Sequence, residues 1–396
     1  MLRKSLKSAK QISNKYLLLV ALIVIALAFA VFQFIKYKGT TSHATGEAVF
    51  HEAESGTIAG AATTIADSNT SGGSYLKFAS NTSSFQPSAP YYATFFYPWY
   101  KNPTTDGSWS DWQDNGHAPP QNWFSNFLPD MDSTKLDPAT ELYSSNNVST
   151  VYWQLNKLKE AKQEVAISSW WGQGHKTDLA FKKIVTDIMN RADNPYPRFR
   201  WTIYYENEGF SNPTVAQIVS DLNYIKSNYT SQSSYLKING KPVIFVYADA
   251  TDGADMASRW AQAKSQTGFY VVLKVYSGYK TDPNQPDSWH QYSPAVRSDS
   301  QGSYSYSVSP GFWLDGNAPR LPRDLAAFKS AVSSMVSSSA VWKLTETWNE
   351  WGEGTSVEPA DQVIQTTSGT ATLDPNGAPF KNAYVDVLNQ LLPPLE

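Results

Sequence analysis

The stretch that decides the fold is "VWKLTETWNEWGEGTSVEP", residues 341–359. Its first half predicts a short apolar strand, and its second half places Glu350, Glu353 and Glu358 among tryptophans. Charged residues make up only 17% of the chain, so a local gathering of carboxylates stands out. A solvated loop is the simplest interpretation, whereas a strand that ends in paired acids would indicate catalysis. The other strands decide between the two.

Short apolar strands alternate with amphipathic helices from Tyr91 onward. The strand candidates are residues 91–100, 164–171, 198–209, 241–250, 269–277, 303–313 and 341–351. Helical spacing of apolar residues occurs in residues 148–162, 179–192, 214–229, 252–266 and 322–337. This alternation predicts a parallel sheet, closed as an α/β (β/α)8 TIM barrel over residues 91–396. A doubly wound open sheet is the alternative, but no glycine-rich nucleotide-binding loop supports it.

A TIM barrel gathers its chemistry in the loops at the C-terminal ends of its strands. Nearly every predicted strand of this chain runs into aromatic and polar side chains at that end. The predicted substrate-binding residues are Tyr97, Trp99, Trp109, Trp112, His117, Trp170, Trp171, Tyr205, Glu206, Tyr247, Tyr276, Trp348, Asn349 and Trp351. Trp and Tyr stack on the C–H faces of sugar rings and also offer a polar group. The pattern predicts a glycan-binding cleft that contains acids.

Glu350 and Glu353 are the predicted catalytic pair. Glycoside cleavage commonly uses one protonated and one ionised carboxyl group, and burial against Trp348 and Trp351 would raise one pKa. In a straight strand, residues three apart face opposite sides. The pair therefore requires the chain to leave the strand at about Asn349 and to turn at Gly352. Glu358 is expected to make a structural contact.

Composition excludes several other classes of function. The chain has 396 residues and a net charge of −3, without a long basic run after residue 40, so nucleic acid is not expected as a partner. It has no cysteine, which excludes disulfides and thiol nucleophiles. The five histidines show no metal-binding spacing, and we expect no metal and no other cofactor. The absence of a G-x-S-x-G motif argues against an esterase.

The N-terminal region predicts a membrane anchor followed by a β-rich fragment. Residues 1–16 form a basic tail, and residues 17–35 are almost wholly apolar and long enough to cross a bilayer as a signal anchor. A signal peptide cleaved after Ala30 is the alternative. Residues 36–48 are a polar linker. Residues 49–86 resemble the first strands of a carbohydrate-binding module, or serve as a spacer. The catalytic domain is therefore expected outside the cytoplasm, on a single-pass membrane protein.

Two motifs are similar to those of one enzyme family. "FFYPWYKNPTTDGSWSDW", residues 95–112, together with "TWNEWGEGTSVEPA", residues 347–360, resembles glycoside hydrolase family 99, the endo-α-1,2-mannosidase-like proteins. The resemblance implies a (β/α)8 barrel that cleaves internal α-mannosidic linkages with retention. It also implies that the substrate's own 2-hydroxyl acts as the nucleophile. By position, Glu350 corresponds to the base for that hydroxyl, and Glu353 to the acid/base at the glycosidic oxygen.

Two positions depart from the family pattern. Gly352 stands where the family has a histidine between the glutamates, and Asp111 stands where the early motif has another histidine. Each change removes a hydrogen-bonding group near the expected site. A non-catalytic glycan-binding protein, or one that assembles surface polysaccharides, is therefore the alternative function on the same barrel.

Overall fold

The computed structural model describes residues 62–66, 74–78, 85–132, 134, 137–249, 251–365, 371–374 and 380–395. The chain divides into two compact units, Met1–Lys77 and Phe78–Glu396. In the N-terminal region, β1 (Ala62–Ala66) and β2 (Ser74–Phe78) form a two-stranded sheet. The predicted anchor at residues 17–35 lies outside the described residues. Within the described part of the chain, no helix is long and apolar enough to span a membrane.

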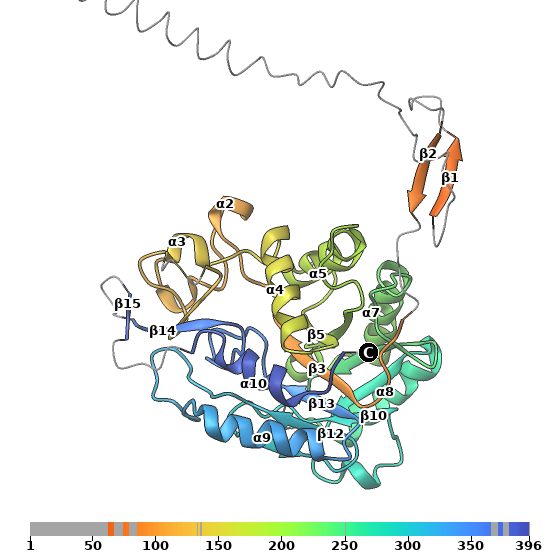
Figure 1. Ribbon diagram of the computed structural model, residues 1–396. Helices are drawn as coiled ribbons and strands as arrows, with labels where there is room; N and C mark the ends of the chain where they lie inside the picture. Colours follow the sequence, from red (N-terminus) through yellow and green to blue (C-terminus); the bar gives the residue numbers. More distant parts are fainter. Residues whose placement is uncertain are drawn as a thin grey trace, which may run out of the picture. The chain divides into compact units, whose positions relative to one another are not determined.

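A curled sheet of parallel strands forms the centre of the second unit (Figure 1). Its parallel strands are β3 (Tyr91–Phe96), β5 (Val165–Trp170), β6 (Arg200–Tyr205), β8 (Lys241–Val246), β9 (Tyr270–Lys274), β10 (Ser288–His290), β12 (Ser305–Val308) and β13 (Trp342–Thr345). Their order in the sheet is β10-β9-β8-β6-β5-β3-β13-β12. The two ends of this order, β10 and β12, lie side by side. This arrangement confirms the predicted barrel-like fold.

Helices follow most of the strands, as the sequence predicts. They are α4 (Val148–Glu160), α5 (Lys176–Thr186), α7 (Val215–Asn228), α8 (Ala254–Thr267), α9 (Leu325–Ser337) and α10 (Ala383–Leu391). Two connections depart from the ideal repeat. Only the 3₁₀ turn η4 (Tyr279–Thr281) lies between β9 and β10, and the short β11 (Ser298–Ser300) lies between β10 and β12. β11 pairs antiparallel with β12.

Capping residues fix where the helices begin. The side chain of Asn147 accepts a hydrogen bond from the Ser149 N–H at 2.8 Å, which starts α4. Thr214 and Gln217 form a reciprocal capping box at the start of α7. Val151 and Leu155 of α4 are buried, so this helix packs its apolar face on the sheet.

A second small sheet joins the loops after the first and last barrel strands. It contains β4 (Phe127–Pro129), β14 (Ala360–Ile364) and β15 (Thr372–Leu373), all paired antiparallel. The remaining short elements are α2 (Pro103–Asp106), η2 (Asp114–Gly116), α3 (Pro138–Glu141), η3 (Ile188–Asn190), α6 (Glu208–Ser211) and β7 (Lys237–Ile238). Because β4 follows β3 and β14 follows β13, their pairing connects the two loops that carry the motifs.

Candidate active site

The last barrel strand ends earlier than the sequence predicts. β13 ends at Thr345, so Glu350 and Glu353 both lie in the loop that follows it. The loop turns tightly where the Gly354 N–H donates to the Trp351 carbonyl at 3.0 Å. Gly354 has a φ of +61°, and an added Cβ would lie 2.8 Å from the Trp313 carbonyl oxygen. The turn required to place both glutamates in one site is therefore present at Trp351–Gly354.

Asn349 fixes this loop to the end of β3. Its side-chain oxygen accepts from the Tyr97 N–H at 2.8 Å, and its amide nitrogen donates to the Tyr97 carbonyl at 3.1 Å. The Trp348 N–H also donates to the Phe95 carbonyl at 2.7 Å. All these groups are buried, so breaking the bonds would leave unpaired polar atoms. Asn349 thus sets the position of the residue next to it, Glu350.

Glu358 anchors the far end of the loop. Its carboxylate accepts from the Trp348 indole at 2.8 Å, the Gln154 amide at 2.8 Å and the Tyr143 hydroxyl at 2.7 Å. The Tyr143 hydroxyl also receives the Trp351 indole N–H at 3.0 Å. This buried network agrees with the structural contact expected for Glu358.

Burial raises the pKa values of both candidate catalytic carboxyls, and repulsion by neighbouring carboxylates adds to the effect on Glu350. The pKa of Glu350 lies well above its usual range because of burial, and because Glu353 and Asp111 add nearby negative charge. Burial raises the pKa of Glu353 to about 7, while Arg320 acts in the opposite direction. Oε2 of Glu353 is buried and has no hydrogen-bond partner among the described residues. The pair can therefore hold a proton near neutral pH, and one carboxyl oxygen remains unsatisfied.

Tyrosines and a third carboxyl surround the pair. The Tyr97 hydroxyl donates to the Tyr292 hydroxyl at 2.8 Å. Burial raises the pKa of both hydroxyls, and the charges of Glu350 and Glu353 raise them further. Glu206 follows β6 directly and is 5% exposed. Burial, with a further contribution from Glu353, raises the pKa of Glu206 to about 8. Protonated Glu206 can donate a hydrogen bond, so the site presents both donors and acceptors to a polyol.

Further aromatic side chains extend this group of tyrosines. Trp99 packs against Tyr97 at 4.7 Å between ring centroids. Tyr247 follows β8, and its ring centroid lies 6.3 Å from that of Tyr292. Burial raises the pKa of Tyr247, and the charges of Glu206 and Glu353 add to this effect. Trp171 is half-buried and donates from its indole to Ser169 at 3.1 Å. Of the predicted binding residues, Tyr97, Glu206 and Tyr247 thus have described electrostatic links to the pair.

Other predicted binding residues are buried in the core of this structure, and their contact with substrate stays a prediction. Trp112, Trp170, Tyr205, Trp348, Asn349 and Trp351 have no exposed surface. The Trp112 indole donates to the Tyr143 carbonyl at 2.8 Å. The Trp170 indole donates to Asp178 at 2.8 Å, and the Tyr205 hydroxyl to Asp221 at 2.8 Å. The sequence does not distinguish these buried aromatic residues from exposed ones, because the alternation of side chains along a strand does not show which face of the strand borders the cleft.

The remaining predicted residues have protein partners of their own. His117 is held by Asp315 at 2.6 Å and by Asn122 at 3.2 Å. The Tyr276 hydroxyl donates to Asp282 at 2.5 Å, and its ring packs on Trp289. Trp109 is half-buried against the core. These contacts do not join His117, Tyr276 or Trp109 to either glutamate.

Sequence reasoning missed Tyr292 and gave Arg320 no role. Tyr292 follows β10, a strand of only three residues, Ser288–His290, with too little alternation to recognise. Arg320 lies in an irregular segment without a sequence pattern. Its link to the site is that its positive charge lowers the pKa of Glu353. Asp111 forms an ion pair with Lys176 at 2.6 Å. The sequence marked Asp111 as a departure from the family motif but did not predict this ion pair.

The space beside Gly352 is filled by an aromatic ring. A Cβ added at Gly352 would lie 2.6 Å from Cε1 of Phe124 and 3.3 Å from Oε1 of Glu350. The Gly352 N–H donates to that same Glu350 oxygen at 3.1 Å. A larger residue would therefore disturb both Phe124 and Glu350. This explains locally why glycine occupies the position between the two glutamates.

The chain resembles known proteins in both sequence and fold. Residues 87–284, half of the chain, match the model of glycosyl hydrolase family 99. Glycoprotein endo-alpha-1,2-mannosidase of Mus musculus is 21% identical over 249 residues, which cover 55% of this chain and 48% of that protein. The same-named protein of Rattus norvegicus is 21% identical over 341 residues, covering 71% of this chain and 70% of that one. The alignment thus spans about half of the mouse relative.

A solved structure shares the fold. The GH99 endo-alpha-mannosidase from Bacteroides thetaiotaomicron, in complex with bis-tris-propane, superposes with a TM-score of 0.58 at 17% identity. The match covers 77% of this chain and 97% of the bacterial chain. It supports the barrel-like fold independently of the strand order. Because the family model covers half of the sequence, this chain belongs to glycosyl hydrolase family 99.

Proposed function

We propose that this protein is a retaining, endo-acting glycoside hydrolase that cleaves α-mannosidic linkages of a glycan. The observation that carries this proposal is the buried Oε2 of Glu353, which has no hydrogen-bond partner among the described residues. Burial raises the pKa of this carboxyl to about 7, and its charge raises the pKa of Glu350. A general acid works best when its pKa lies near the working pH. The linkage is suggested by the names of the mouse and rat relatives.

The protonation of the pair sets the starting state of the reaction. In the free protein, burial and two neighbouring carboxylates favour a proton on Glu350. The base role requires Glu350 to be ionised, so substrate binding has to move that proton. A sugar 2-hydroxyl that donates to Glu350 would stabilise its carboxylate form, as the Gly352 N–H already does. Glu353 would then hold the proton of the pair and serve as the acid.

The first step forms a 1,2-anhydro sugar. Glu350 takes the proton of the 2-hydroxyl, and this oxygen attacks C1 of the same ring. The bond from C1 to the glycosidic oxygen breaks, and Glu353 gives its proton to that oxygen, so the aglycone leaves as an alcohol. General acid–base assistance of this kind contributes a factor of about 10² to 10⁴ in rate.

The second step opens the anhydro sugar with water. Glu353, now ionised, takes a proton from water, and the water oxygen attacks C1. The bond between C1 and O2 breaks, and Glu350 returns its proton to O2. Two inversions at C1 give net retention without a covalent bond to the protein. Both carboxyls return to their starting protonation, so the cycle balances.

The groups around the pair would bind the reacting sugar. Tyr97 and Tyr292 provide hydroxyls linked at 2.8 Å, and Glu206 provides a carboxyl that burial keeps protonated at neutral pH. Each can donate to or accept from a ring hydroxyl. Tyr247 and Trp99 add aromatic faces for the apolar side of the sugar.

Product analysis tests the proposal. The full-length protein is incubated with yeast α-mannan and with a glucosylated mannose glycan, and the products are followed by NMR and chromatography. Release of oligosaccharides whose new reducing end appears first as the α-anomer supports endo cleavage with retention. Release of free mannose alone would contradict endo action. Binding to these glycans without turnover would establish the non-catalytic alternative instead.

We further propose that residues 17–35 anchor the protein in a membrane, with the barrel outside the cytoplasm. The basis is the sequence alone: a basic tail followed by an apolar run of bilayer length. Mass spectrometry of the mature protein and carbonate extraction of membranes test it. An intact N-terminus in the membrane pellet supports an anchor, whereas a mature protein that starts at Val31 would show cleavage.

A further inference from the structure

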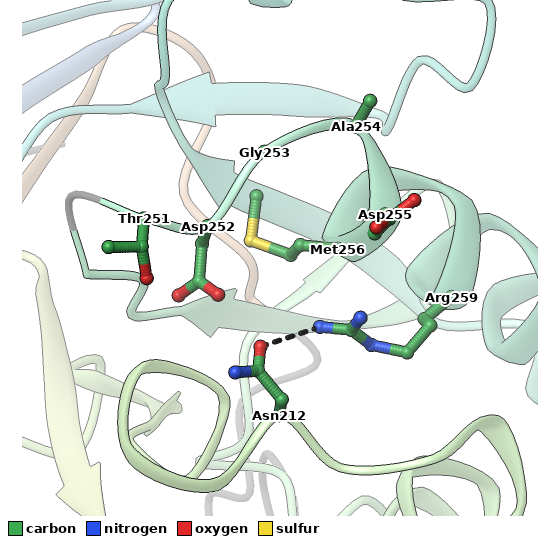
Figure 2. Close-up of a pocket in the computed structure, with 8 residues that line it drawn as sticks. All are labelled: Asn212, Thr251, Asp252, Gly253, Ala254, Asp255, Met256 and Arg259. Atoms are coloured by element: carbon green, nitrogen blue, oxygen red, sulfur yellow. Dashed lines mark hydrogen bonds between the residues drawn. The ribbon is translucent and has the colours of Figure 1, made fainter.

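A polar cavity lies at the start of α8, beside the segment that follows β8. Its volume is about 400 Å³, and its lining includes Asn212, Asp252, Gly253 and Arg259. Figure 2 shows that Arg259 reaches from α8 toward Asn212 and that Asp252 projects into the same space. Arg259 Nη2 donates to the Asn212 side-chain oxygen at 3.2 Å. Nε of Arg259 is buried without a hydrogen-bond partner among the described residues.

An exposed aromatic ring lies in α6, shortly before Asn212 of the cavity lining. Phe210 of α6 is 64% exposed, although both Trp171 and Tyr247 pack against its ring. The centroid separations are 4.7 Å to Trp171 and 5.7 Å to Tyr247, and the Tyr247 ring is nearly parallel. A single exposed apolar residue is common on any protein. Phe210 differs because it ends a row of rings that runs from Tyr97 through Tyr292 and Tyr247.

The loop of Phe210 lies directly against the loop that follows β8. A Cβ added at Gly209 would lie 2.3 Å from the Tyr247 ring and 3.3 Å from the Asp249 nitrogen. Burial raises the pKa of Tyr247, and the charges of Glu353 and Asp252 add to this effect. Tyr247 thus packs against the segment that carries Phe210 and lies within electrostatic reach of Asp252, a residue of the cavity lining. Glu208 connects α6 to α8, because its buried carboxylate forms an ion pair with Arg259 and accepts a hydrogen bond from the Trp260 indole.

We propose that Phe210 and this cavity form a distal subsite for a further neutral sugar of the glycan. The C–H face of a sugar would stack on the exposed ring of Phe210, while its hydroxyls would reach Arg259 Nε, Asn212 and Asp252. An anionic ligand is disfavoured, because Asp252 and Asp255 both line the cavity and Arg259 is already paired with Glu208. The inference rests on the proposed function and adds an account of chain-length preference.

Two variants remove the subsite without touching the glutamate pair. Phe210→Ala deletes the stacking ring. Asn212→Gly deletes the amide, and glycine accepts the left-handed backbone at this position, where φ is +45°. Arg259 is left intact because its loss would strand the buried Glu208. The matched control is Leu325→Ala, an exposed apolar residue at the start of α9, which follows a strand four places from β6 in the sheet.

The test compares kcat/KM on α-mannosides of increasing length. We expect the wild type and Leu325→Ala to gain activity with length. Phe210→Ala and Asn212→Gly should each lose about three- to tenfold on the longer substrates and nothing on the shortest one. Calorimetric binding of the same oligosaccharides to Glu353→Gln, with and without Phe210→Ala, separates the two proposals. If Phe210→Ala matches its parent at every length in both assays, the subsite is wrong, even if cleavage is real. If no substrate is turned over but Phe210→Ala weakens binding of the longer chains, the subsite stands and the hydrolase fails.

Discussion

At the residue scale, each glutamate is defined by what surrounds it. Glu350 is 7% exposed and bonded to the Gly352 N–H, whereas Glu353 keeps one buried oxygen unsatisfied. Burial raises both pKa values, and the pair's mutual repulsion adds to the effect on Glu350. These environments could not be predicted from the spacing E-x-x-E, because that spacing is common in sequences without a site.

The pKa of Glu353 predicts how activity depends on pH. The reaction needs Glu353 to carry a proton once substrate is bound, and burial raises the pKa of Glu353 to about 7. We therefore expect kcat/KM to fall about tenfold per pH unit above roughly pH 7. A pH–rate profile from pH 4 to 9 measures this. Activity that keeps rising to pH 9 would show that Glu353 does not act as the acid.

Gly352 gives a second prediction at this scale. In Gly352→Ala the new methyl group would meet Phe124 at 2.6 Å and approach Oε1 of Glu350. We expect a loss of activity of about ten- to a hundredfold, because small displacements of catalytic groups are costly. The double variant with Phe124→Ala makes room for the methyl group, and most of the activity should return. An unchanged defect in the double variant would mean that Phe124 is not the cause.

At the element scale, the loop after β13 is positioned by its neighbours. Asn349 ties it to β3, Glu358 ties it to α4 through Gln154, and β4 pairs with β14 beyond it. The sequence predicted seven of the parallel strands and five of the helices, because each carries a clear apolar pattern. It missed β10 and α10, and it extended β13 to residue 351. The strand is short because the chain turns into the site, a tertiary constraint without a local signal.

Asn349→Ala tests the role of this attachment. The substitution leaves the N–H and carbonyl of Tyr97 without partners in a buried place, at a cost of about 1–3 kcal/mol in unfolding free energy. It should also lower kcat more than it raises KM, since Glu350 is the next residue. The control is Asn228→Ala, which removes a 2.8 Å bond to the Tyr224 carbonyl at the end of α7. Equal kcat values for the two variants would refute a positioning role.

At the scale of the whole molecule, the barrel contains buried carboxyls outside the catalytic pair. Burial raises the pKa of Glu346, inside the barrel, to about 8, and that of Glu141 on α3 to about 8. Most of the tryptophans predicted to bind sugar are buried in the core. Composition counts aromatic residues but does not divide them between core and cleft.

These raised pKa values predict how stability depends on pH. A carboxyl whose folded pKa exceeds its unfolded value keeps its proton in the folded state and loses it on unfolding. Its stabilising contribution is full below about pH 4.5 and is lost as the pH rises to about 8, at up to about 1.4 kcal/mol per unit. The melting temperature should therefore fall between pH 5 and pH 8. Glu141→Gln, which imitates the protonated acid, should reduce that fall; an identical pH dependence in the variant would contradict the account.

The most direct test of the central claim is the rate of α-mannan cleavage by Glu350→Gln and Glu353→Gln. Both substitutions preserve size and remove the ionisable group, and circular dichroism would check that the fold is kept. We expect each variant to lose about 10² to 10⁴ in kcat. On a glycosyl fluoride, whose leaving group needs no proton, Glu353→Gln should recover part of this loss and Glu350→Gln should not. Wild-type rates in both variants would show that the glutamate pair does not carry the reaction.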